Sequence, residues 1–298
     1  MKIVNIIGGL GNQMFQYAFA CFLQNRSPQE DILIDTSHFH YLLLKKWKTA
    51  NLHNGYELDK VFPNLMLPKA SVCQLAQVSW YIPNYLLSRL GRRLLPSRKK
   101  EYIQPVEKYF TYDEAALSDT YCYLEGQWEC IQYCLPIREK LKYVFAHGVP
   151  NSTNRQYIHD IANENSVGIH VRRGDYLLSE TFQGICDIGY YQKGINKILE
   201  DNADHVFYIF SNDINWCKEN ISPLLEGHRI VLVTVNVGKD SCWDMFLMTY
   251  CKDLIIANSS FSWWAAFLNK RGGKVIAPQK WFNRDAQFDI WADEWIRI

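Results

Sequence analysis

The second half of the chain alternates between short apolar runs and amphipathic segments of helical period. The runs predict buried strands at Val167–Val171, Val206–Phe210, Ile230–Val235, Leu254–Ala257 and Lys274–Ala277. The segments between them predict helices near Tyr190–Glu200, Trp216–Leu225, Trp243–Cys251 and Ser262–Asn269. Strands separated by helices indicate βαβ units and a parallel sheet. Ligands of such sheets bind beyond the carboxyl ends of the strands, so residues that follow a strand are the first candidates for a site.

The first half opens with the same alternation. A strand at Lys2–Ile7 is followed by a glycine turn, a helix at Met14–Phe22 and a strand at Asp31–Asp35. This order is typical of an α/β layer fold.

Residues 36–150 contain few clean strands, and we predict helices there at Glu114–Leu117 and Ile131–Phe145. The Gly, Pro, Asn and Ser residues of His147–Arg155 indicate a linker. We therefore predict an α/β protein with two Rossmann-like domains that face a cleft. The domains would comprise residues 1–150, on the acceptor side, and residues 151–298.

Composition places the chain among globular proteins. Of its 298 residues, 48% are hydrophobic and 21% are charged, and the net charge of +1 provides no overall field for nucleic acid. The apolar runs are far shorter than the roughly 20 residues that span a bilayer, so we expect a cytoplasmic protein. The nine cysteines form no CxxC pair, and the closest group, Cys122, Cys130 and Cys134, lacks the spacing of a zinc site. We expect reduced thiols and no metal.

The segment Gly168–Tyr176 (GIHVRRGDY) ends a predicted strand in a histidine and two arginines. Because side chains alternate along a strand, His170 and Arg172 should face one side and Arg173 the other. Guanidinium groups bind phosphate oxygens bidentately, which makes this edge a candidate anion site. The next glycine permits a turn, and Asp175 can orient an arginine. A purely structural Arg–Asp pair is the alternative.

A second predicted strand, in Phe207–Asp213 (FYIFSND), ends in three small polar residues. Ser211 and Asn212 are candidates for hydrogen bonds to a ligand. Asp213 would either do the same or cap the following helix.

A third predicted strand leads into Asn258, Ser259 and Ser260 and then into a helix. Backbone N–H groups and hydroxyls at a helix N-terminus form a ready anion site. The serines would act as helix caps, as phosphate ligands or as both. We expect the neighbouring Trp263 and Trp264 to lie in the core or the wall of the site.

The turn at residues 8–14 (GGLGNQM) fits a dinucleotide-binding loop only in part. Its spaced glycines match the start of GxGxxG, but Met14 occupies the third glycine position. Asp35 ends the second strand, as a ribose-binding acid would. A nicotinamide-dependent oxidoreductase is therefore an alternative function. The amides of Asn12 and Gln13 suggest instead a turn that offers polar side chains to the cleft.

Four blocks together resemble the α-1,2-fucosyltransferases, in their bacterial, GDP-fucose-dependent form. They are GGLGNQMFQYA at 8–18, HVRRGDY at 170–176, FSND at 210–213 and NSSFSWW at 258–264. The resemblance spans residues 3–281 and implies a GT-B-like fold. It also implies an inverting transfer of L-fucose from GDP-β-L-fucose to the 2-OH of a galactose, in α linkage and without a metal or other cofactor.

The same resemblance implies roles for single residues. Arg172 matches an arginine that engages the β-phosphate of the donor, and we expect Asp175 and Asn12 to join it in catalysis. Departure of the diphosphate leaves negative charge that Arg172 and backbone dipoles would stabilise. The proton acceptor is open among Asp175, Glu180 and Asp187, or no strong base is needed. The expected donor contacts are Gly11, His170, Arg173, Ser211, Asn212, Asn258, Ser259, Ser260 and Phe261.

The resemblance also implies a galactose-terminated glycan or a lipid-linked oligosaccharide as acceptor, as in O-antigen biosynthesis. The basic, leucine-rich segment Tyr85–Lys100 would either rest on anionic lipid at the inner face of the plasma membrane or form a solvated helix with a buried leucine face. A catalytically silent protein that binds glycans or sugar nucleotides is a further alternative.

Overall fold

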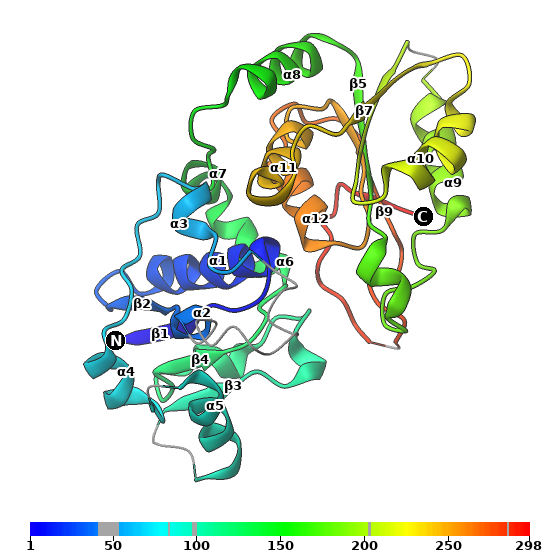
Figure 1. Cartoon of the computed structure of the whole chain (residues 1–298). Helices are drawn as coiled ribbons and strands as arrows, with labels where there is room; N and C mark the ends of the chain where they lie inside the picture. The colour runs from blue at the N-terminus through cyan, green and yellow to red at the C-terminus, as the bar shows by residue number, and fades with distance from the viewer. Residues whose placement is uncertain (41–53, 83, 97–99, 202–203, 285) are drawn as a thin grey trace. The chain divides into compact units, whose positions relative to one another are not determined.

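The computed structural model describes residues 1–40, 54–82, 84–96, 100–201, 204–284 and 286–298. The chain forms two compact units, Met1–Gly148 with Ala286–Ile290, and Val149–Asp285 with Trp291–Ile298. The units divide two residues before the predicted boundary, and the return of 286–290 to the first unit was not predicted. Each unit contains a parallel sheet with helices packed around it (Figure 1), so the α/β class is confirmed.

The first unit is built on a parallel sheet of order β2-β1-β4-β3. The described strands of this sheet are β1 (Lys2–Asn5), β2 (Ile32–Asp35), β3 (Glu101–Ile103) and β4 (Tyr123–Glu125). The sequence predicts β1 and β2, but β3 and β4 are too short to produce a readable alternation. The largely buried helix α1 (Leu10–Arg26) connects β1 to β2.

Short helices complete the first unit. The single helix predicted at Ile131–Phe145 is wrong, because Pro136 lies in a 3-10 turn, Leu135–Ile137, that separates α6 from α7. Glu114–Leu117 is also a 3-10 turn, as is Val106–Lys108. The helices are α2 (Ser37–His40), α3 (Leu58–Val61), α4 (Val72–Val78), α5 (Tyr85–Leu94), α6 (Ile131–Cys134) and α7 (Arg138–Val144).

The second unit contains a parallel sheet of order β10-β9-β8-β5-β6-β7. All five predicted strands are confirmed, with ends that differ by at most two residues. The two-residue β10 was not predicted. The strands are β5 (Ser166–Val171), β6 (Val206–Ser211), β7 (Arg229–Val233), β8 (Asp253–Ile255), β9 (Val275–Ala277) and β10 (Ile296–Arg297).

Helices follow the strands of the second unit in alternation. The helix α8 begins inside the predicted linker, where the Asn151 side chain accepts a hydrogen bond from the N–H of Asn154 and caps the helix. The 3-10 turns are Gly174–Leu178, Ser222–Leu225 and Gly238–Asp240. The helices are α8 (Ser152–Asn163), α9 (Ile188–Leu199), α10 (Ile214–Asn220), α11 (Cys242–Met248) and α12 (Ser260–Phe267).

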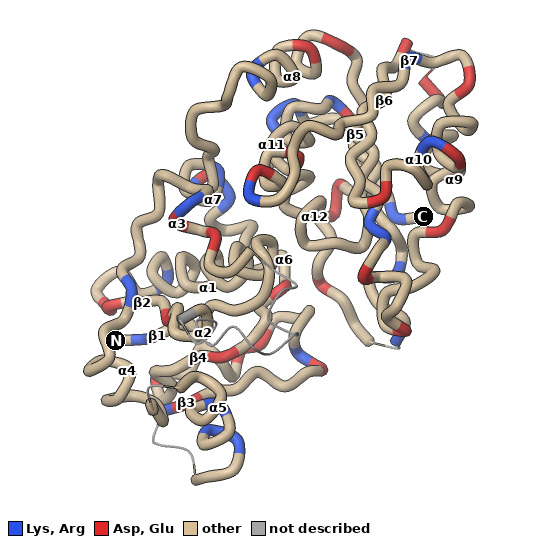
Figure 2. The backbone as a smooth tube through the Cα atoms, viewed as in Figure 1, with Lys and Arg blue, Asp and Glu red and all other residues tan. Residues whose placement is uncertain are grey.

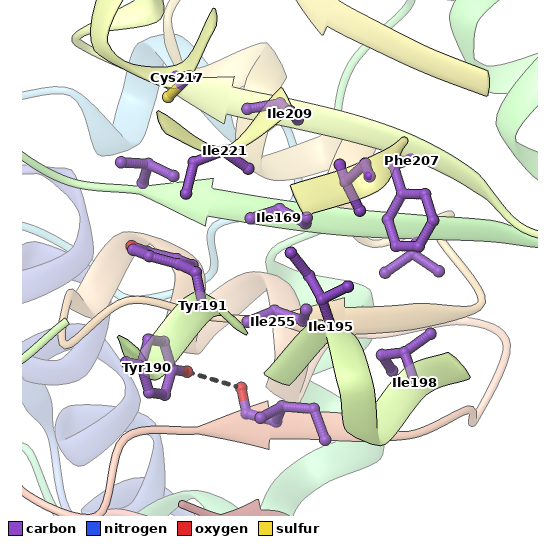
Figure 3. Close-up of a cluster of buried hydrophobic side chains, with 14 residues drawn as sticks. Ile169, Tyr190, Tyr191, Ile195, Ile198, Phe207, Ile209, Cys217, Ile221 and Ile255 are labelled. Carbon is purple, nitrogen blue, oxygen red and sulfur yellow. Dashed lines mark hydrogen bonds between the residues drawn. The ribbon is translucent and has the colours of Figure 1, made fainter. Parts of the chain in front are cut away.

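The core of this unit fixes α9 against the sheet (Figure 3). Ile195 and Ile198 of α9 pack with Ile169 and Ile255, which are fully buried. The hydroxyl of Tyr190 lies 2.5 Å from the carbonyl oxygen of Ile256, just after β8, and 3.2 Å from that of Ile276 in β9, so that its one hydrogen is shared between the two. The carboxyl ends of these strands are therefore held in place from one face of the sheet.

The strand order reverses between β5 and β8. The chain runs outward from β5 through β6 to β7, then returns to β8 and continues to β9 and β10. Such a reversal opens a crevice beyond the carboxyl ends of the two strands that flank it, and ligands of doubly wound sheets bind there. The segments that begin at residues 172 and 256 lie at this point.

Candidate active site

Arg172 follows the last residue of β5 and pairs with a carboxylate one turn later. Its Nη2 atom lies 2.8 Å from Asp175 Oδ1 and 3.0 Å from Oδ2. The guanidinium carbon lies 5.4 Å from the centroid of the Tyr176 ring. The buried Nε of Arg172 has no hydrogen-bond partner among the described residues. The guanidinium is thus oriented by Asp175 and retains donors for a ligand.

Arg173 turns away from Arg172 and joins the end of β5 to the end of β6. Its Nε lies 3.2 Å from Asp213 Oδ2, and its guanidinium carbon lies 4.1 Å from the ring of Trp216. Its backbone N–H donates to Asn212 Oδ1 at 2.9 Å, and Asn212 Nδ2 donates to its carbonyl at 3.3 Å. The predicted opposition of the two arginines is confirmed. Arg173 pairs with Asp213 and not with Asp175.

The polar residues after β6 are also engaged within the unit. Asp213 caps α10 by accepting the N–H of Trp216 at 3.2 Å, as one of the two interpretations predicts. The hydroxyl of Ser211 accepts the N–H of Asp213 at 2.9 Å. Ser211 and Asn212 therefore hold the loop, and donor contacts through them remain predictions.

His170, the residue before the end of β5, is a neutral imidazole. Burial, and secondarily the charge of Arg172, lower the pKa of His170 to about 3. Its ring centroid lies 5.7 Å from that of Phe261 on α12, and its Nδ1 has no hydrogen-bond partner within the described parts of the chain. A neutral ring with an unused nitrogen can form one hydrogen bond with a bound nucleotide, either as donor or as acceptor.

The turn after β8 is fixed by Asn258. Its Nδ2 donates to the carbonyl of Trp281 at 3.2 Å, its Oδ1 accepts from the thiol of Cys186, and its carbonyl accepts the hydroxyl of Tyr176 at 3.2 Å. The last contact ties this turn to the loop that carries Arg172. The side chain of Asn258 is thus used inside the unit.

Ser259 and Ser260 follow at the start of α12. Ser259 is the N-cap residue, but its hydroxyl makes no capping hydrogen bond. A helix leaves its first N–H groups without intrahelical acceptors and carries partial positive charge at this end. The N-terminus of α12 can therefore receive an anion. The following Trp263 and Trp264 are fully buried, which confirms them as core residues.

The structure thus brings three predicted blocks together within the second unit. The loops after β5 and β8 meet at the strand-order reversal through the Tyr176–Asn258 hydrogen bond and the His170–Phe261 contact. The loop after β6 supports the first of them from the other side. A guanidinium, a neutral imidazole and a helix N-terminus form an arrangement that suits a diphosphate.

The fourth block, the glycine turn, lies in the first unit. Gln13 is fully buried: its Nε2 donates to the carbonyls of Gly8 and Gly55 at 2.8 Å, and its Oε1 accepts the N–H of Glu57 at 3.0 Å. The prediction that Gln13 offers its amide to a ligand is therefore wrong. Asn12 is half-buried and donates to Gln127 Oε1 at 3.3 Å, and Gly11 is buried in α1.

Asp35 does not serve as a free ribose-binding acid. It is buried and accepts hydrogen bonds from the Tyr123 hydroxyl at 2.8 Å, from Asn5 Nδ2 at 3.4 Å and from the N–H of Ser37 at 2.8 Å. Met14, at the position of the third fingerprint glycine, is fully buried in α1. Both observations argue against the nicotinamide alternative.

The candidate proton acceptors have different environments. Asp187 caps α9 by accepting the N–H of Tyr190 at 2.8 Å, Glu180 is exposed, and Asp175 is paired with Arg172.

Sequence reasoning missed two carboxyl groups, because their burial leaves no signal in spacing or composition. Asp244, in the first turn of α11, accepts from Asn236 Nδ2 at 2.9 Å, and burial raises its pKa to about 7. Glu129 follows β4 in the first unit, and burial raises its pKa to about 8.

No group of three or more His, Cys, Asp or Glu side chains in the described ranges is arranged to hold a metal ion. No described helix has both the length and the apolar character needed to cross a membrane.

Comparisons with known proteins agree on one family. The model of Glycosyl transferase family 11 matches residues 93–298. An Alpha-1,2-colitosyltransferase from Escherichia coli is 31% identical over 99% of this chain and 98% of its own length. The O-antigen biosynthesis glycosyltransferase WbnK from Escherichia coli is 29% identical over 98% of each chain. The mouse Galactoside alpha-(1,2)-fucosyltransferase 2 is 32% identical over 41% of this chain and 35% of its own.

A solved structure supports the fold. The fucosyltransferase NodZ from Bradyrhizobium superposes with a TM-score of 0.51 over 89% of this chain and 92% of its own, at 15% sequence identity. The fold is thus of the GT-B type expected from the resemblance. From its motifs, its two Rossmann-like units and these matches, the chain belongs to glycosyltransferase family 11.

Proposed function

We propose that this glycosyltransferase transfers L-fucose from GDP-β-L-fucose to the 2-OH of a galactose, with inversion and without a divalent metal. The acceptor would be an oligosaccharide or a lipid-linked glycan precursor. The observation that carries the proposal is the oriented guanidinium of Arg172 at the strand-order reversal, beside the N-terminus of α12. Support for the linkage comes from the names of the colitosyl- and fucosyltransferase relatives.

The reaction requires the site to stabilise the negative charge of the leaving diphosphate. The acceptor oxygen bonds to C1 of the sugar while the bond from C1 to the diphosphate oxygen breaks, and GDP leaves with additional negative charge. Arg172 and the N–H groups of α12 would stabilise that charge in place of a metal ion. Asp175 would orient the guanidinium of Arg172. The proton of the acceptor hydroxyl would pass to a carboxylate or to the departing diphosphate.

The first test is an Arg172→Ala variant assayed with GDP-fucose and a panel of galactosides, with chelator present. Loss of one preorganised donor should lower kcat by about 10²–10³. Arg229→Ala is the matched control, because Arg229 lies at the amino end of β7, opposite the site, and is 58% exposed in a pair with Glu164. Near wild-type turnover by Arg172→Ala would refute the role of the guanidinium. So would a wild-type activity that the chelator abolishes and that only manganese restores.

A colitosyl donor is the second candidate, because the colitosyltransferase matches nearly the whole chain. Colitose is fucose without its 3-hydroxyl, so the two donors differ by a single polar group. Parallel assays with GDP-fucose and GDP-colitose, on lactose, N-acetyllactosamine and Gal-β-1,3-HexNAc acceptors, distinguish them. A site that hydrogen-bonds the 3-hydroxyl should reject the deoxy sugar strongly. Absence of transfer from either donor would favour a silent binding protein.

A further inference from the structure

The helix α5 (Tyr85–Leu94) of the first unit is packed with its polar face inward. The residues that it buries are Tyr85, Ser88 and Arg92, with exposed fractions of 4%, 2% and 6%. The side chain of Arg92 donates to Glu125 Oε2 at 3.0 Å and to the carbonyl of Trp80 at 3.3 Å. A surface helix normally buries its apolar stripe, so this orientation is reversed.

Polar contacts rather than leucines hold the helix in this orientation. Arg92 lies over the rings of Tyr85 and Tyr123, with its guanidinium carbon at 5.6 and 4.9 Å from their centroids. Arg89 Nε approaches the other oxygen of Glu125 at 3.1 Å. The expectation of a solvated helix with a buried leucine face is therefore wrong.

The leucines form a continuous exposed stripe on the opposite side. At 3.6 residues per turn, the four leucines at 86, 87, 90 and 94 fall within an arc of about 100°, centred opposite the buried face. Their exposed fractions are 40%, 51%, 51% and 72%, and Ile82 and Leu95, which flank the helix, are also exposed, at 44% and 47%. We call the four helical leucines the leucine stripe. Contiguous exposed apolar surface of this kind marks an interaction site.

Charge around the stripe selects the partner. Tyr85–Lys100 contains six basic residues and no acidic one; Figure 2 shows blue and no red along α5. Glu125 pairs with both Arg89 and Arg92 and balances one of their two positive charges, whereas Arg93 and Lys100 are exposed. In a two-fold contact between copies of the chain, the cations beside each stripe would face one another without an acid between them. An anionic surface removes that repulsion.

We propose that the leucine stripe is a membrane-docking surface that binds anionic lipid. The helix would lie in the plane of the bilayer interface, with its leucines among the upper acyl chains and Arg93 and Lys100 among the phosphates. The polar contacts to Glu125 would fix α5 as a rigid anchor. Docking on this surface would let the first unit meet an acceptor carried on a lipid.

The test is sedimentation of the full chain with large vesicles of phosphatidylcholine containing about 30% phosphatidylglycerol, with pure phosphatidylcholine vesicles alongside. Leu87→Ser/Leu90→Ser/Leu94→Ser should lower the partition coefficient at least about tenfold. Arg93→Gln should weaken binding to the anionic vesicles at low salt and have little effect at high salt. Val149→Ser/Val237→Ser, which changes exposed apolar residues of the second unit, is the matched control and should bind like the wild type.

Circular dichroism and thermal unfolding establish that each variant is folded, and because these leucines are exposed we expect the fold to be retained. The readout is independent of the transferase reaction, so failure of the proposed function would leave it intact. The proposal is overturned if the wild type does not bind anionic vesicles, or if the triple variant binds as well as the wild type. A wild-type dimer in ultracentrifugation that the triple variant abolishes, without vesicle binding, would identify a second copy as the partner.

Discussion

Glu129 gives the sharpest physical prediction that the structure allows. The residue is 5% exposed, and burial raises its pKa from 4.5 to about 8. The loop around it is rigid: Gln104 Oε1 accepts the N–H groups of Gln127 and Trp128, and the Trp128 ring stacks on Phe19 at 4.1 Å. These contacts hold the backbone on the N-terminal side of Glu129 in place.

The cost of this burial follows from linkage. Below pH 4.5 both folded and unfolded chains hold the proton, so there is no penalty. Between pH 4.5 and 8 only the folded chain holds it, and the free energy of unfolding falls by about 1.4 kcal/mol per pH unit. The penalty reaches about 5 kcal/mol above pH 8. This value is a ceiling, because local opening that hydrates the carboxylate limits the cost.

Glu129→Gln removes the titration and keeps the shape. The variant should exceed the wild type in unfolding free energy by about 1 kcal/mol at pH 5.5 and by up to about 5 kcal/mol at pH 8.5. In a unit of this size the larger figure corresponds to roughly 10–20 °C in Tm. Denaturant and thermal unfolding at the two pH values measure the difference. Glu107→Gln, at an exposed position of the same unit, is the control and should show no pH-dependent gain.

The comparison is decisive because other titrating groups affect both proteins equally. If Glu129→Gln is no more stable than the wild type at pH 8.5, the carboxylate is hydrated in the folded chain and the reasoning fails.

Three further predictions concern the end of β5 and the loop that follows it. Asp175→Asn should lower kcat/KM about 5- to 10-fold and leave Tm unchanged, because the pair is too exposed to stabilise the fold yet directs the guanidinium; an unchanged kcat/KM would contradict this. Gly174→Ala should cost about 1–3 kcal/mol of stability, since its φ is +60° and a Cβ would lie 2.7 Å from Asn212 Nδ2. Gly184→Ala, at φ +73° in open space, should cost less, and equal losses would refute the steric argument. The NMR signal of the His170 ring should stay flat from pH 5 to 8, and a midpoint near 6.5 would show that the imidazole is hydrated.

The sequence predicts much of the second unit because its signals are local. Strands such as β5 and β6 are continuous apolar runs, and the polar residues that follow them are next to the strand in the chain. Parallel pairing then places their carboxyl ends at one edge, which is how the loops after β5 and β8 come together. The same logic fails for β3 and β4, whose three-residue lengths carry no period.

Roles that depend on distant partners could not be predicted from the sequence. Arg173 follows Arg172 directly, yet one pairs with a residue three positions away and the other with Asp213, 40 positions away. Local spacing indicates that two arginines lie at an edge but not which of them has donors left for a ligand. That difference depends on the position of Asp213, which only the fold brings to Arg173.

The orientation of α5 also depends on a distant partner that the sequence pattern does not reveal. Its period separates leucines from polar residues clearly, and the hydrophobic effect alone would turn the leucines inward. Glu125 lies 33 residues after Arg92, at the end of a strand that the sequence does not reveal, and supplies a buried carboxylate that accepts a hydrogen bond from each of two guanidinium groups. A buried arginine without that partner would cost several kcal/mol, so the pair can be buried only together. Because a lone Arg92→Leu would leave Glu125 short of a partner, we expect it to destabilise the first unit despite adding apolar surface to the core.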